Sequence, residues 1–69
     1  MRTTCVLIPD PDGGYTALNP ETGTASQGDT IEEAEANLKE AVELYFESFP
    51  DAPIGRPPLM TYIDILENA

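Results

Sequence analysis

The sequence predicts a small α+β domain with the order β-β-β-α-β, a single unit over residues 1–69. Three observations favour this class. Short segments of β-branched and apolar residues, separated by turn residues, occupy the first part of the chain. One long segment then carries apolar residues every three or four positions, as an amphipathic helix does. A further segment rich in strand-forming residues follows, so we expect one helix packed on one face of a sheet.

The first two predicted strands form a hairpin. Residues 3–8 are β-branched and apolar and stop at Pro9, which indicates a strand in which Cys5 is expected to be an inert core residue. Residues 10–14 are rich in aspartate and glycine, which bond their own backbone or supply positive φ angles in turns. The alternating residues 15–18 then predict a second strand that pairs with the first.

A third strand is predicted over residues 24–27, and a last one over residues 59–65 after a proline-rich loop. The last strand is a candidate sheet edge, and an exposed apolar edge invites pairing with a second copy of the chain. The alternative is a strand that lies within its own sheet. Because so small a domain buries little surface by itself, we favour self-association. The residues expected to mediate it are Leu59, Tyr62 and Ile63.

Residues 31–48 form the clearest predicted element, an amphipathic helix that begins after Thr30. Thr30 and Glu33 make a capping box, in which each side chain accepts a hydrogen bond from the backbone N–H of the other residue. Pro50 disfavours helical geometry at the residue before it, so the helix should end near Ser48. The apolar stripe expected to face the sheet consists of Ile31, Ala34, Leu38, Ala41, Val42, Tyr45 and Phe49.

The charge balance argues against several classes of function. Thirteen acidic residues stand against three basic ones, for a formal net charge of −10. Nucleic-acid binding normally requires a cluster of lysine and arginine, so we expect no direct nucleic-acid partner, and an anionic membrane is disfavoured for the same reason. No apolar run reaches the roughly 20 residues of a transmembrane helix, and none fits a signal peptide. We expect a cytoplasmic protein whose natural partner is basic.

The outer face of the predicted helix is acidic. Glu40, Glu43 and Glu47 follow one another at helical spacing. Such a face is either a docking surface for a basic protein or a plain solvated surface, and the pattern alone leaves both open. If the face docks a partner, these three glutamates are the expected partner-binding residues.

The chain lacks the residue pattern that catalysis or metal binding would need. Histidine is absent, and the single cysteine lies in an apolar segment. Ribonucleases of the RNase H type use carboxylates that converge on two divalent metals, including one in the first strand. Residues 3–8 contain no acid. We therefore expect no catalytic residue, no metal site, no cofactor and no enzymatic activity.

Three segments of the chain occur together in a known family of proteins. They are Asp12–Tyr15 in the first turn, Gln27–Thr30 before the helix, and a helical pattern that comprises Glu32-Glu33-Ala34, Asn37, Glu40-Ala41 and Leu44-Tyr45. In these segments the chain resembles the HicB antitoxins, over roughly residues 5–47. The resemblance implies a partial RNase H-like sheet. It also implies a partner, the small basic HicA-type toxin, an mRNA-cleaving ribonuclease whose catalytic histidine the antitoxin covers.

The resemblance leaves two functional hypotheses. Many members of the family carry a C-terminal DNA-binding segment, but this sequence stops at Ala69, directly after the predicted last strand, so we do not expect that activity here. The main hypothesis is a non-catalytic antitoxin that occludes a toxin and forms a homo-oligomer, either a dimer or a tetramer. The alternative is a solitary, self-associating structural or regulatory protein of the same fold, with no toxin partner.

Overall fold

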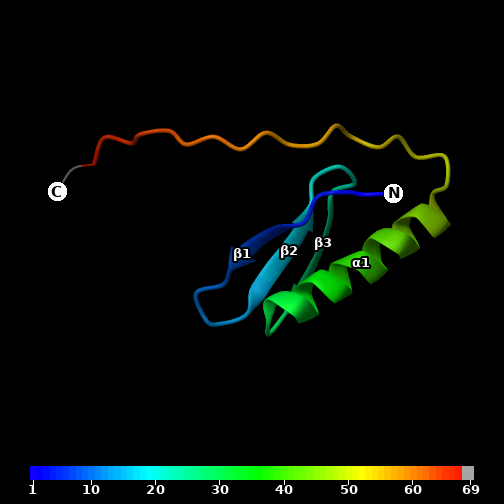
Figure 1. Ribbon diagram of the computed structural model, residues 1–69, viewed down its shortest axis with the longest axis horizontal. Helices are drawn as coiled ribbons and strands as arrows, with labels where there is room; N and C mark the ends of the chain where they lie inside the picture. The colour runs from blue at the N-terminus through cyan, green and yellow to red at the C-terminus, as the bar shows by residue number, and fades with distance from the viewer. Residues whose placement is uncertain (68–69) are drawn as a thin grey trace.

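The computed structural model describes residues 1–67 and contains a three-stranded antiparallel sheet with one helix packed against it (Figure 1). The strands are β1 (Val6–Pro9), β2 (Tyr15–Asn19) and β3 (Thr24–Gly28), in the spatial order β1-β2-β3, and the helix is α1 (Ile31–Ser48). The predicted α+β class and the order of the first four elements are therefore confirmed.

The β1–β2 hairpin has the turn that the sequence predicts. Val6 pairs with Leu18 and Pro9 pairs with Tyr15, which leaves five residues in the connection. Gly13 and Gly14 in this connection have φ angles of 97° and 82°, values that residues with a Cβ rarely adopt. The positive φ angles expected in this turn are thus present.

The first strand begins later than predicted, at Val6 instead of residue 3. Thr3 and Thr4 leave the ladder because they bond to the side chains of Asn19, the last residue of β2, and Glu21, in the β2–β3 connection. The Asn19 side-chain amide donates to Thr3 Oγ1 at 2.9 Å and to the Thr4 carbonyl at 2.7 Å, and the Glu21 carboxylate accepts from Thr4 N–H at 3.1 Å. Side-chain hydrogen bonds replace strand pairing at this end of the sheet.

Helix α1 has the predicted boundaries and an N-terminal cap that differs from the prediction in one bond. Thr30 Oγ1 accepts from Glu33 N–H at 3.1 Å, as a capping box requires. The Glu33 carboxylate, however, accepts from the backbone N–H of Asp29 at 3.3 Å, not from that of Thr30. At the other end, the Phe49 N–H donates to the Tyr45 carbonyl at 2.8 Å, and the helix stops just before Pro50.

The core between the sheet and the helix is small. Its buried apolar residues in the described part of the chain are Ala17, Ala34, Leu38 and Val42, with Leu7, Tyr15 and Phe46 partly buried around them. Ile31 and Phe49, at the two ends of the predicted stripe, remain exposed. The reason is length, since an 18-residue helix is about 27 Å long whereas a five-residue strand spans about 17 Å.

The helix lies close to β3 because Gly28 permits it. Helix α1 packs most extensively on β3 and then on β2. A Cβ built on Gly28 would lie 2.8 Å from the Ala34 Cα, a distance that real side chains essentially never show. The Asn37 side-chain amide adds a hydrogen bond to the Gln27 carbonyl at 2.7 Å. The glycine and the asparagine together fix the helix over this edge of the sheet.

The predicted last strand does not form in the single chain. Residues 59–65 have no regular secondary structure, and in Figure 1 they run past the sheet without joining it. A strand is stable only when a neighbouring strand pairs with its backbone N–H and C=O groups. The prediction was wrong because residue composition shows which segments favour an extended conformation but not whether a partner strand lies beside them. Because this segment is extended, the Cα radius of gyration is 14.5 Å, whereas a compact chain of this length has a radius of gyration of about 11 Å.

Candidate interaction surfaces

The outer face of α1 carries the glutamates that the sequence singles out. Glu40, Glu43 and Glu47 are all exposed, and their spacing of three and four residues places them in one row. Leu44 lies beside this row and is 61% exposed, although it is a large apolar side chain. The face therefore combines a row of three carboxylates with one apolar side chain at its edge, and we call it the acidic face (Glu40, Glu43, Leu44 and Glu47).

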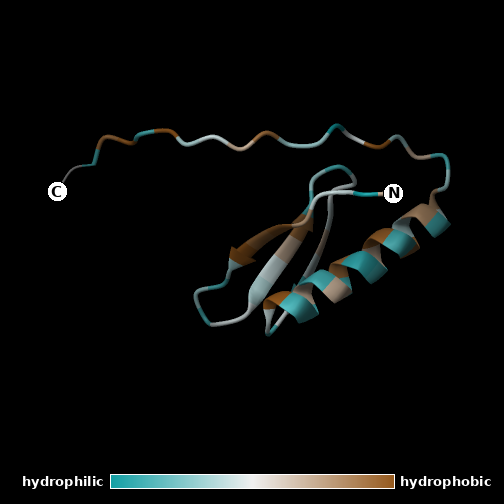
Figure 2. Cartoon of the chain, in the orientation of Figure 1, coloured by the Kyte–Doolittle hydropathy of each residue, from teal (hydrophilic) through white to brown (hydrophobic). Residues whose placement is uncertain are grey.

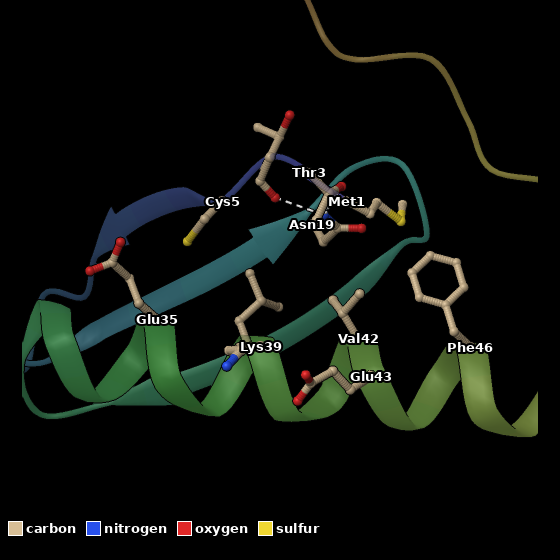
Figure 3. Close-up of a pocket in the computed structure, with 11 residues that line it drawn as sticks. Met1, Thr3, Cys5, Asn19, Glu35, Lys39, Val42, Glu43 and Phe46 are labelled. Carbon is tan, nitrogen blue, oxygen red and sulfur yellow. Dashed lines mark hydrogen bonds between the residues drawn. The ribbon is translucent and has the colours of Figure 1, made fainter.

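A groove lies on the other flank of α1, between the helix and the start of β1 (Figure 3). Its volume is about 420 Å³. Met1, Thr4 and Cys5 line it on the strand side. The helix side is apolar along its base, with Leu38, Val42 and Phe46, and carries the charged residues Glu35, Lys39 and Glu43 at its rim. We call this hollow the β1–α1 groove.

Cys5 lies at the strand side of the groove and is exposed, so the expectation of a core cysteine was wrong. No neighbouring strand covers β1 on this side within residues 1–67. Partial burial and the negative charge of Glu35 raise the pKa of the Cys5 thiol. The thiol therefore stays protonated at neutral pH and is a poor nucleophile.

Two buried polar residues fix one end of the groove. Asn19 is fully buried. Its side-chain carbonyl oxygen accepts hydrogen bonds from the backbone N–H of Thr22 at 3.0 Å and from the Thr22 hydroxyl at 2.6 Å. The side-chain amide of Asn19 donates to Thr3 and Thr4. Figure 3 shows this amide directed at the N-terminal segment. The Asn19 side chain thus ties the start of the chain to the β2–β3 connection.

Glu21 completes this polar cluster. Burial by itself would raise the pKa of its carboxyl, but the hydroxyl and N–H of Thr4 donate to Oε2 at 2.7 and 3.1 Å and hold the pKa below its ordinary value. Within residues 1–67, Glu21 Oε1 is buried without a hydrogen-bond partner. The carboxylate is therefore a structural group that keeps the N-terminal segment in place.

The N-terminus of α1 is surrounded by carboxylates. A shallow hollow beside it is lined by the β1–β2 turn and by Asp10, Asp29 and Glu33. Asp10 accepts from the Thr16 hydroxyl at 3.0 Å, and Glu33 bonds to the Asp29 N–H. Because negative charge already lies at the positive end of the helix dipole, this hollow is unsuited to a phosphate group.

Neither a metal-binding cluster nor a membrane-spanning helix occurs in the part of the chain that the structure describes. No cluster of three or more histidine, cysteine, aspartate or glutamate side chains with a metal-binding arrangement occurs among residues 1–67. In the same part of the chain, α1 is too polar to cross a membrane.

The residues predicted for self-association lie on a different surface from the acidic face. Leu59, Tyr62 and Ile63 are 95%, 89% and 80% exposed, in the extended segment after the helix. The structure brings the three glutamates together on α1 and leaves the three apolar residues outside the folded part. Two separate surfaces are thus available for partners.

Sequence reasoning missed three residues that matter at these surfaces. Leu44 falls outside the predicted apolar stripe, and a helical projection that asks which large apolar residues lie opposite the stripe would have found it. Asn19 and Glu21 lie in a predicted turn, and nothing in their spacing distinguishes a buried polar cluster from an exposed connection. Only the folded chain brings Thr3 and Thr4 against them.

Taken together, these features define a small acidic α+β domain that offers surfaces for proteins. The chain is similar to two curated proteins of Synechocystis sp. (strain ATCC 27184 / PCC 6803 / Kazusa). It is 54% identical to UPF0150 protein ssr1765 over 46 residues, which cover 65% of this chain and 58% of that protein. It is 49% identical to UPF0150 protein ssl0738 over 45 residues, which cover 64% and 62%.

The chain spans about three fifths of the length of these curated relatives. No family model matches it, and no solved structure matches it.

Proposed function

We propose that this protein is a HicB-like antitoxin domain that binds a small basic HicA-type toxin and occludes its active site without any catalysis. The observation that carries the proposal is the acidic face of α1, where the exposed Leu44 lies beside the row formed by Glu40, Glu43 and Glu47. Protein interfaces commonly combine an apolar anchor with a charged rim. The resemblance of the turn, cap and helix motifs to the HicB family supports the same function.

The charge of the whole chain suits such a partner. A net charge of −10 accelerates the encounter with a basic protein, because long-range attraction steers the two surfaces together. The three glutamates would then meet lysine or arginine side chains at the rim, and Leu44 would be buried in the complex. Occlusion of this kind is stoichiometric, and we place it in the cytoplasm, where a toxin that cleaves mRNA would act.

The test is co-expression with the candidate toxin. In the source genome, the candidate is a short reading frame beside this one that encodes a basic, histidine-containing protein. Induced alone, that protein should stop growth, and this chain should restore growth. With purified proteins, RNA cleavage should fall to zero at a fixed stoichiometric ratio, as measured on a labelled RNA. Continued cleavage in the presence of excess chain contradicts the proposal.

A charge-reversal variant tests the interface. The double change Glu43→Lys and Glu47→Lys should weaken toxin binding by about tenfold or more, measured by titration calorimetry, because attraction becomes repulsion at the rim. The matched control is Asp12→Lys with Asp51→Lys, which alters net charge equally but lies outside the acidic face. Equal weakening by both variants would show that only the net charge matters. No weakening by either would show that the interface does not include the outer face of α1.

A second candidate function is a self-associating structural or regulatory protein with no toxin partner. The exposed apolar segment after α1 favours it, because isolated chains rarely expose so many large apolar side chains in succession. The genome neighbourhood separates the two candidates, since an antitoxin is expected beside its toxin.

A further inference from the structure

The segment after α1 exposes a row of apolar side chains with nothing to cover them. Six large apolar residues of this segment are between 71% and 95% exposed. Figure 2 shows apolar and polar residues mixed along this extended segment, at a distance from the sheet. Exposure of this extent in a folded protein usually marks an interaction site. The residues are Leu59, Met60, Tyr62, Ile63, Ile65 and Leu66.

Within residues 1–67, strand β1 has an unpaired outer edge to which a further strand could be added. In the chain as described, β1 pairs with β2 on one side and has no strand on the other. Figure 2 shows β1 as one of the most hydrophobic parts of the molecule, and the β1–α1 groove lies at its start, where Thr3, Thr4 and Cys5 line it. Unpaired backbone groups next to an apolar hollow are what an added strand would satisfy.

The lengths of the two parts agree. Strand β1 alone spans about 13 Å at the usual rise of a strand, and residues 3–5 before it extend this edge to about 23 Å. Residues 59–66 span about 26 Å on the same basis. Alternate residues of an extended strand point to opposite faces, so Leu59, Ile63 and Ile65 share one face with Thr61. The other face carries the carboxylate of Asp64 along with Met60, Tyr62 and Leu66. The first of these faces is the better match for the apolar base of the groove.

The chain leaves its own domain near this edge and then runs past the sheet without pairing with it (Figure 1). The Gly55 N–H donates to the Glu21 carbonyl at 2.9 Å, and the Glu21 side chain binds Thr4 just before β1. Arg56 is followed by Pro57 and Pro58, which lack backbone donors and keep the chain extended. From there, residues 56–67 make no backbone hydrogen bond to the sheet. An extended apolar segment next to an open sheet edge is suited to pairing with a second copy.

We propose that residues 59–66 of one copy dock along β1 of a second copy and fill its β1–α1 groove, while the second copy returns the same contact. Each exchanged segment becomes the fourth strand of the other copy's sheet. Leu59, Ile63 and Ile65 enter the groove over Leu38 and Val42. In this symmetric dimer, the open edge of β1 and the β1–α1 groove of each copy are both occupied.

The small core of the domain favours the same arrangement. Only four apolar residues are buried in the described part of a single chain. Exchange would bury further large apolar side chains from each copy. Since each copy carries a net charge of −10, apolar contact and strand pairing must overcome repulsion between the two. Added salt should therefore strengthen this dimer.

The first experiment measures the oligomeric state of the full chain by sedimentation velocity. We expect a dimer at micromolar concentration, and Ile63→Asp should raise its dissociation constant by about tenfold or more, because a carboxylate replaces an apolar contact. The matched control is Leu44→Asp, which makes the same chemical change on the outer face of α1 and should leave the dimer intact. Circular dichroism should show the helix unchanged in Ile63→Asp, because Ile63 is outside the folded part.

The second experiment establishes which surfaces meet. A fluorescently tagged chain with its native Cys5 is mixed with an untagged chain that carries Cys5→Ser and one introduced tail cysteine, followed by mild oxidation with diamide. Cys5 lies on the side of β1 that faces α1 (Figure 3). Leu59→Cys, Thr61→Cys or Ile63→Cys should therefore yield a tagged, cross-linked dimer severalfold more efficiently than the neighbouring Met60→Cys and Tyr62→Cys.

Several results would overturn the exchange. A monomer at all concentrations would do so. In a separate variant that keeps Cys5 and also carries Ile63→Cys, a cross-link that forms only within one chain would do so too, since the segment would then close on its own β1. Cross-links between two tails without any to Cys5 would show that the segments pair with each other. None of these measurements uses a toxin, so they test the exchange independently of the antitoxin proposal.

Discussion

At Gly28, the backbone of β3 meets the backbone of α1 with no side chain between them. A Cβ at this position would fall on the backbone of Glu33 and Ala34. The same residue lies in the Gln27–Thr30 segment that precedes the helix cap. The requirement for glycine here is therefore steric, and it does not come from the turn.

Gly28→Ala should lower the free energy of unfolding by about 1–3 kcal/mol, because the helix must move away from the sheet to admit a methyl group. Urea denaturation followed by circular dichroism measures the change. Gly23→Ala is the comparison, since Gly23 has a φ of 75° but open space around it and should cost only about 1 kcal/mol of backbone strain. An equal or smaller loss at Gly28 would contradict the close approach of α1.

Glu21 gives the stability of the domain a specific dependence on pH. Its folded-state pKa is lowered, so its contribution to stability is fully present above its ordinary pKa of 4.5 and is lost as the pH falls through the folded-state value. Glu21→Gln should therefore be less stable than the parent at pH 7, and the difference should shrink below about pH 4.5. Thermal unfolding across this pH range measures it.

Thr4→Val, which removes the hydroxyl donor, should reproduce part of the Glu21 effect. A constant difference between Glu21→Gln and the parent from pH 7 to pH 3 would contradict this role of the carboxylate.

At the scale of elements, α1 illustrates how strongly local sequence can specify structure. Its start at Ile31 and its end at Ser48 follow from the Thr30 cap and from Pro50, both visible in the sequence. The segment 59–65 behaves in the opposite way. It has strand-forming residues but no neighbour in the single chain, and a strand depends on residues that are distant in sequence.

Thr30→Ala should destabilise the domain by about 1 kcal/mol, because the Glu33 N–H loses its hydrogen-bond acceptor. Chemical denaturation monitored at 222 nm by circular dichroism provides the value. Ser48→Ala is the comparison, since Ser48 is exposed at the other end of α1 and should shift stability by no more than about 0.5 kcal/mol. A Thr30→Ala protein as stable as the parent would show that the cap is dispensable.

At the scale of the whole molecule, charge and apolar exposure point to two different kinds of partner. The acidic face suits a basic protein, whereas the segment 59–66 and the open edge of β1 suit a second copy of the chain. The two surfaces adjoin at Glu43, which belongs to the acidic face and also lines the β1–α1 groove.

Salt should act on these two associations with opposite signs. Raising NaCl from about 0.05 to 0.5 M shortens the Debye length several-fold, so binding to a basic toxin should slow whereas self-association should strengthen. Stopped-flow fluorescence measures the first and sedimentation velocity the second. An on-rate independent of salt would argue against charge steering, and a dimer weakened by salt would argue against an apolar interface.

The sequence by itself determined the class of the fold, the hairpin turn and the complete extent of α1. Each of these rests on residues close together in the chain, such as the Asp12-Gly13-Gly14 turn and the Thr30 cap. The acidic row on α1 could also be read from helical spacing.

Only the tertiary structure decided the exposure of Cys5, the buried Asn19 and Glu21 cluster, and the fate of residues 59–65. Those features depend on contacts between residues 15 or more positions apart, as in the bonds from Asn19 to Thr3 and Thr4. Local propensity carries no information about such contacts. Burial and strand pairing are properties of the assembled surface.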